Sequence, residues 1–157
     1  MRTFSAPVQT IIDSDLIEFA FLIKLTFNTT YYFTSNSHDV VYDGNTYLAN
    51  GGLYEFDSPK FSTVIDRESY KVVISELLDE MLPEFKSNVV GKSIEVFVTL
   101  RDANGQLLLG TSDVLSVYKG VVDKPSITNN YEQKLAVLEG TSPMSDLDMV
   151  KTFISSK

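Results

Sequence analysis

"SIEVFVTLR", residues 93–101, is the stretch that decides the fold class of this 157-residue chain. Its even-numbered side chains are all apolar: Ile94, Val96, Val98 and Leu100. The odd-numbered ones are Glu95, Phe97, Thr99 and Arg101. A period of two is typical of a β-strand with one buried face, whose other face is wet or covered by a neighbouring element. The stretch therefore predicts a strand that turns one face toward the core.

Similar segments lie on both sides of this strand. They are "EFAFLIKLTF" (18–27), "TYYFTS" (30–35), "KFSTVID" (60–66), "SYKVVISEL" (69–77), "DVLSVYKGVVDK" (113–124) and "YEQKLAVLEG" (131–140). Aromatic and β-branched residues favour a pleated surface. We expect "QLLLG" (106–110) to begin the return strand after a turn at 102–105, and the polar "PSITNN" (125–130) to join two strands.

Asp43-Gly44 lies between "HDVVY" and "NTYLA" and predicts a β-hairpin, because both turn positions tolerate a positive φ. Helices are expected in three places only. A short one should span 5–12 with Pro7 in its opening turn, and a second should run from Pro83 to before Gly91. A third should follow Ser145, a suitable N-cap.

Together these patterns predict a mainly β fold, a single β-barrel or sandwich-like domain with one or two short helices and a C-terminal helix. Residues 16–142 would form the β-rich domain. Residues 1–15 would be an N-terminal arm or short helix, and 143–157 a C-terminal helix or arm.

The composition excludes several classes of function. The chain has no cysteine, so zinc–thiolate sites, iron–sulfur clusters and cysteine nucleophiles are absent. A net charge of -8 disfavours nucleic acid or an anionic membrane as the main partner, because phosphate binding requires basic residues. The longest apolar run, "FAFLI" from Phe19, is too short to span a membrane, and the N-terminus does not resemble a signal peptide.

His38 is the only histidine, and Ser37 and Asp39 are its neighbours. Members of a catalytic triad face one another from separate elements, whereas neighbours in an extended segment point apart. Only a distant partner such as Asp57 or Glu76 would rescue a hydrolase hypothesis. Oxygen ligands on Asp39, Asp43 and Asn45 would suit calcium, but their spacing does not match an EF-hand loop.

Four carboxylates gather around the second expected helix: Glu76, Asp79, Glu80 and Glu84. A buried pair facing a cleft could perform glycosidase chemistry. On a short helix such residues more often form a solvated face. We therefore predict no enzymatic activity, no catalytic or metal-binding residue and no cofactor.

Aromatic residues are concentrated in the first half of the chain, and this density on a β surface suits protein–protein contact. Phe97 also indicates a protein–protein contact, since it lies on the strand face that should be exposed to solvent unless a neighbour covers it. Met149 and Phe153 fall near one face of the C-terminal helix. The interface candidates are Tyr31, Phe33, Tyr42, Tyr47, Tyr54, Phe56, Phe97, Met149 and Phe153. A carbohydrate-binding β module, with tyrosines stacking on sugars, is the alternative.

The order of segments adds a resemblance. An apolar strand leads into "YYFTSNSHDVVYDGNTYLANGG", and "VGKSIEVFVTLRDANGQLLLGTSDVLSVYKG" and "EQKLAVLEGTSPMSDLD" follow later. Over residues 16–148 this resembles the N-terminal domain of tail hub proteins from the tips of long flexible phage tails and from gene transfer agents. It is more distantly similar to the lambda tail-tip protein L. None of these motifs is a catalytic fingerprint.

The resemblance implies a structural virion protein, made in the host cytoplasm and located at the tail tip. Its partners would be copies of itself in a ring, a trimer by family analogy, together with the distal tail protein and the central tail-tip or fibre protein. The alternative within the tail is a subunit of the distal tail ring, which has a similar β-rich core. Longer relatives continue into a cysteine-bearing part that can hold an iron–sulfur cluster; this chain has no cysteine.

Overall fold

The computed structural model describes residues 5–13, 17–49, 53–56, 69–75, 80–130 and 133–141. Its strands are β1 (Phe19–Thr26), β2 (Thr30–Thr34), β3 (Val40–Tyr42), β4 (Asn45–Tyr47), β5 (Leu53–Phe56), β6 (Ser69–Ser75), β7 (Ser93–Leu100), β8 (Leu115–Asn130) and β9 (Gln133–Thr141). The helices are α1 (Ala6–Ile12) and α2 (Met81–Ser87). The prediction of a mainly β, barrel-like or sandwich-like fold with one or two short helices is confirmed. The expected C-terminal helix lies outside the described residues.

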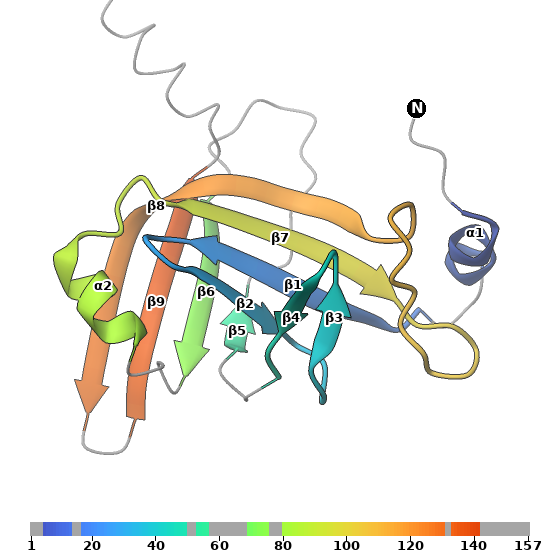
Figure 1. Ribbon diagram of the computed structural model, residues 1–157, viewed down its shortest axis with the longest axis horizontal. Helices are drawn as coiled ribbons and strands as arrows, with labels where there is room; N and C mark the ends of the chain where they lie inside the picture. The colour runs from blue at the N-terminus through green and yellow to red at the C-terminus, as the bar shows by residue number, and fades with distance from the viewer. Residues whose placement is uncertain are drawn as a thin grey trace, which may run out of the picture.

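Seven strands form one antiparallel sheet in the order β2-β1-β7-β8-β9-β6-β5, and β3 and β4 form a separate hairpin. The 16-residue β8 belongs to both halves of the sheet. Its first part pairs with β7 as far as Val121, and the rest pairs with β9 from Val121 onward. Because β8 changes partner, β1 and β7 run across the molecule while β9 and β6 run steeply to them, and the sheet curls (Figure 1).

The corner of β8 is built from glycines and one tyrosine. Gly120 and Gly140 lie in neighbouring strands beside the side chain of Tyr118. The Tyr118 ring stacks on Tyr70 with centroids 4.7 Å apart. A Cβ on Gly120 would overlap the Tyr118 Oη and the Thr141 carbonyl oxygen. The tight bend thus depends on a residue without a side chain.

The main core lies on the inner face of the curled sheet. β1 contributes Phe21 and the fully buried Ile23 and Leu25, and β7 contributes Ile94 and Val96. Helix α2 covers this core with Met81 and Phe85. The presence of a short helix here agrees with the sequence-based prediction. The helix begins two residues before the expected Pro83.

The outer face of β1 and β7 is covered as well. The β3–β4 hairpin lies over it and forms a second, smaller core from Leu22, Val40, Tyr47 and Val114. Phe97 packs against this cluster, with its ring centroid 6.3 Å from that of Tyr42. Of the two conditions expected for this strand face, wet or covered, the structure has the covered one. The cover comes from the same chain.

Two sequence-based expectations about strand ends are wrong. Residues 106–110 do not begin the return strand; they make one bridge, Arg101 with Leu107, and β8 begins at Leu115. Leu107 and Leu109 pack instead against the smaller core, so burial on the outer face outweighs continued pairing.

"PSITNN" is not a linker, because it forms the second half of β8 and pairs with β9. Pro125 is tolerated there since β8 pairs with β7 only up to Val121, so this part of β8 lies at an edge, where prolines occur in sheets.

Helix α1 is confirmed where it was expected. The Ser5 Oγ accepts a hydrogen bond from the Val8 backbone N–H at 3.4 Å, and Pro7 lies in the first turn. Such capping satisfies one of the N–H groups that a helix start leaves unpaired. Val8 is fully buried, while Ile12 on the same helix is exposed.

Glu84 on α2 holds the turn between β1 and β2. Its carboxylate accepts hydrogen bonds from the Asn28 N–H at 2.9 Å, the Thr29 N–H at 3.2 Å and the Tyr31 hydroxyl at 2.9 Å. Partial desolvation alone would raise the pKa of Glu84. The hydrogen bonds from Thr29, Tyr31 and Asn28 outweigh it, so the pKa is lowered from its usual value of 4.5.

This arrangement predicts a pH-dependent contribution of Glu84 to stability. A carboxyl whose pKa is lowered by folding stabilises the protein above its unfolded pKa, and this contribution is lost as the pH falls through the folded pKa. We expect Glu84→Gln to lower the urea midpoint at pH 7. The difference from the unmodified protein should shrink as the pH falls below 4.5. A difference that stays constant from pH 7 to pH 3 would contradict it, and Glu80→Gln, which changes an exposed acid at the N-cap of the same helix, is the control.

Candidate functional site

The Ser37-His38-Asp39 cluster is not arranged as a catalytic triad. The Ser37 Oγ lies 2.8 Å from the His38 Nδ1, which is a contact between neighbours on the surface. The Asp39 carboxylate instead accepts a hydrogen bond from the Ala49 N–H at 2.8 Å. Asp39 therefore fastens the segment after β4, and does not orient the imidazole as a triad acid would.

The hairpin residues considered for calcium serve the turn. Asp43 and Gly44 both have positive φ, at 50° and 73°, as a tight two-residue turn requires. The Asn45 side chain donates to the Asp43 carbonyl oxygen at 2.9 Å. In the part of the chain that the structure describes, no three His, Asp or Glu side chains gather closely enough to hold a metal ion.

The carboxylates around α2 do not face a common cleft where they are described. Glu80 is exposed, and Glu84 is engaged by the β1–β2 turn. Glu76 and Asp79 lie outside the described residues. The described pair thus lacks the buried acid that a glycosidase needs.

The structure places the interface candidates in three settings. Tyr31 and Phe33 are buried in the main core, and Tyr47 is buried in the smaller one. Tyr42 and Phe97 are partly exposed at the smaller core. Tyr54 and Phe56 lie on β5, where only the backbone is described, and Met149 and Phe153 lie outside the described residues. An interface role for these residues stays a prediction.

The tyrosines of the hairpin form an aromatic group with β2. The Tyr47 ring lies 5.1 Å from that of Tyr32 and 6.4 Å from that of Tyr42. Burial, followed by the nearby Tyr32 and Tyr42, raises the pKa of Tyr47 well above its usual range. The Tyr47 phenol therefore stays neutral and works as a packing group that fixes the hairpin on the sheet.

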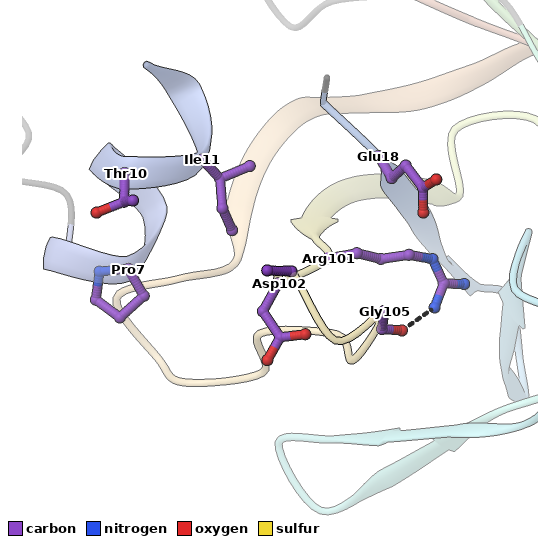
Figure 2. Close-up of a pocket in the computed structure, with 8 residues that line it drawn as sticks. Pro7, Thr10, Ile11, Glu18, Arg101, Asp102 and Gly105 are labelled. Carbon is purple, nitrogen blue, oxygen red and sulfur yellow. Dashed lines mark hydrogen bonds between the residues drawn. The ribbon is translucent and has the colours of Figure 1, made fainter. Parts of the chain in front are cut away.

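A groove that no sequence motif indicated lies between α1 and the turn after β7 (Figure 2). It has a volume of about 610 Å³. Pro7, Thr10 and Ile11 line it from α1, and Ala103 and Gly105 line it from the turn. The remaining lining residues are Glu18, Arg101 and Asp102. Because Pro7, Thr10, Ile11 and Glu18 meet residues 101–105 only in the folded chain, spacing in the sequence could not have revealed this groove.

The turn side of the groove is held firmly. The Asp102 carboxylate accepts hydrogen bonds from the N–H groups of Asn104 at 2.9 Å and Gln106 at 2.8 Å. The bond from Gln106, above all, lowers the pKa of Asp102. Arg101 donates to the Gly105 carbonyl oxygen at 2.8 Å and to the Asn36 side chain. This wall is therefore preorganised and carries a carboxylate that stays charged at neutral pH.

Several large apolar side chains are exposed: Ile12, Ile17, Phe19, Val41, Val90 and Ile127. Most single exposed apolar residues need no explanation. Val41 and Val90, which are 63% and 50% exposed, stand out because each follows a buried valine, Val40 or Val89. Adjacent valines in the sequence are the only signal that could have identified them, since one of each pair must face out.

Within the described ranges, no helix is long and apolar enough to cross a membrane. No protein-family model matches the sequence, and no curated protein matches it either. Among solved structures, the fold is similar to that of a chain in the virion of a native gene transfer agent particle, at 12% identity and a TM-score of 0.57. The match covers 87% of this chain and 44% of that chain. This chain therefore shares its fold with part of a longer virion protein.

Proposed function

We infer that this chain is a structural subunit of a phage-like tail tip. It would form a ring between the distal tail ring and the central tip or fibre protein, around the channel through which DNA leaves. The observation that carries this proposal is the fold match to a gene transfer agent virion chain over 87% of this chain. The order of sequence segments that resembles tail hub proteins supports it independently.

The described polar residues support a structural role over a catalytic one. Asp39, Glu84 and Asp102 each use their carboxylates to bind backbone N–H groups of nearby segments. Carboxylates that bind backbone N–H groups fix loops and are not available as acid, base or nucleophile. The output of such a protein is shape, which suits a subunit of an assembly.

The carbohydrate-binding alternative requires a concave surface lined with aromatic rings. The groove between α1 and the turn after β7 has no aromatic residue among those that line it. Tyr31 and Tyr47 are buried and cannot stack on a sugar. The tail-tip proposal is therefore better supported than sugar binding.

The proposal predicts that the protein does not bind duplex DNA. The net charge is -8, and a negatively charged wall would let DNA pass through a channel without attraction. We expect no retention of duplex DNA near physiological salt in an electrophoretic mobility assay. Tight binding that weakens steeply with added salt would contradict this prediction.

Electron microscopy of intact particles tests the proposed location. With a gold-binding tag on this chain, label should appear at the tail tip, and reconstruction should place the chain in a closed ring, a trimer by family analogy. Label in the ring next to the tail tube would indicate the distal tail ring instead. Particles that assemble and infect without the chain would overturn the proposal.

A further inference from the structure

Two surface features lie at opposite ends of β7. The groove is lined by residues that follow the end of this strand, and Val90 lies in the turn that precedes its start. The eight residues of β7, at about 3.3 Å each, separate the two features by roughly 25 Å. In Figure 1 the α1 end and the α2 end are accordingly at opposite sides of the molecule.

The α1 end is hollow and partly acidic. Pro7, Ile11 and Ala103 supply its apolar lining, and Glu18 and Asp102 supply carboxylates. Arg101 is the one cation among its lining residues, and its guanidinium is engaged by the Gly105 carbonyl oxygen and the Asn36 side chain. An apolar side chain accompanied by lysines would match this groove in polarity and charge.

The α2 end carries such a group. Val90 is 50% exposed and follows the buried Val89. The Val90 N–H donates a hydrogen bond to the Asn88 Oδ1 at 3.0 Å, which fixes the turn. Lys86 precedes it in the last turn of α2 and is exposed, and Lys92 follows it and donates a hydrogen bond to the Asn28 Oδ1 at 3.2 Å. Glu84, the acid of this helix turn, is bound by the β1–β2 turn.

Charge distinguishes Val90 from the other strongly exposed valine. Val41 is 63% exposed, but Asp39 and Asp43 flank it in the hairpin, so it would bring two more carboxylates toward an acidic groove. Val90, in contrast, is flanked by Lys86 and Lys92. We propose that the groove between α1 and the turn after β7 receives the Val90 turn of a second copy of this chain, which makes a head-to-tail contact.

This inference rests on the proposed function, because a ring is built from one patch meeting a different patch on the next subunit. A groove at one end and a matching projection at the other satisfy that requirement within a single chain. The contact would repeat around the axis until the ring closes. It would also leave the curled sheet between the two ends free for other partners.

Sedimentation velocity on the full chain over a range of concentrations tests this contact. Ala103→Lys places a bulky positive charge at an exposed position in the groove, and Val90→Asp places a negative charge on the projection. Each should weaken self-association at least about tenfold, as is common for a central interface residue. Glu18→Lys, exposed and in the groove lining, is a second groove variant, and circular dichroism should show that all variants fold.

Val41→Asp is the matched control and should assemble like the unmodified chain. The decisive sample is an equal mixture of Ala103→Lys and Val90→Asp copies. The first keeps an intact projection and the second an intact groove, so the mixture should form dimers at concentrations well below those at which either variant alone associates.

Three results would overturn the contact. They are an unmodified chain that stays monomeric at all concentrations, a Val90→Asp or Ala103→Lys variant that assembles normally, and a mixture without dimers. Failure of the proposed function looks different, because it would be seen in particles. A ring that persists in particles carrying Val90→Asp would leave the function intact and remove only this contact.

Discussion

Gly120→Ala is expected to destabilise the protein by about 1–3 kcal/mol, as overpacking of a tight interior does. The added Cβ would overlap the Tyr118 Oη and the carbonyl oxygen of Thr141 on the neighbouring strand. A glycine-to-alanine change without such a clash should stabilise by about 0.4–1 kcal/mol, because it restricts the unfolded chain. The sign of the change in the free energy of unfolding therefore reports directly on the packing at the corner of β8.

Urea unfolding followed by circular dichroism measures this effect. Ser116→Ala, an exposed position on the same strand, is the control and should change stability by less than about 0.5 kcal/mol. Gly140→Ala should be milder than Gly120→Ala, because its Cβ would lie 2.9 Å from the Tyr118 Oη and 3.0 Å from the Ile94 Cδ1. Equal stability of Gly120→Ala and the unmodified protein would mean that the corner is built differently.

Tyr118→Phe separates the two clashes at Gly120. Removal of the hydroxyl relieves the overlap with the side chain but leaves the overlap with the Thr141 carbonyl oxygen. In a double-mutant cycle, Tyr118→Phe should recover part of the stability lost in Gly120→Ala, with a coupling of about 0.5–3 kcal/mol. An additive result would show that the backbone clash alone sets the cost.

The second large effect is expected for Leu22→Ala, which should cost about 2–5 kcal/mol. Leu22 lies on the outer face of β1 and is fully buried in the smaller core, which the β3–β4 hairpin forms together with Val114. If that face were open to solvent, the same substitution would cost little. The size of the effect thus tests whether the hairpin packs on the sheet.

Val41→Ala is the matched control for Leu22→Ala. Val41 lies on the β3–β4 hairpin that covers Leu22 but is 63% exposed. Its truncation should therefore change the free energy of unfolding by less than about 0.5 kcal/mol. Chemical unfolding of the two variants side by side gives the comparison. A loss for Leu22→Ala below about 1 kcal/mol would contradict the covering role of the hairpin.

Local patterns were sufficient for most of the individual elements. The alternation in 93–101 and the Asp43-Gly44 turn identified β7 and the hairpin, because side-chain period and positive φ are properties of a few adjacent residues. Residues 106–110 and 125–130 were misread for the converse reason. Whether a segment pairs in a ladder or packs on a core depends on neighbours that are distant in the sequence.

Candidate sites followed the same division. The sequence alone indicated that Ser37, His38 and Asp39 are not arranged as a triad, and the structure gives Asp39 a backbone partner at Ala49. The expectation that all three side chains point apart is wrong for Ser37 and His38, whose Oγ and Nδ1 lie 2.8 Å apart. It could not determine which aromatic residues are buried, because the burial of Tyr31 in the main core and the partial exposure of Tyr42 at the smaller core depend on the elements that cover them.

By itself, then, the sequence determined that this protein is mainly β, acidic and without cysteine chemistry, because these properties depend on residue type and short-range periodicity. Only the tertiary structure decided that β8 joins two halves of one curled sheet, that the hairpin covers Phe97, and that α1 meets the turn after β7 in a groove. Each of those features joins residues far apart in the chain, and their contacts exist only once the hydrophobic effect has folded it.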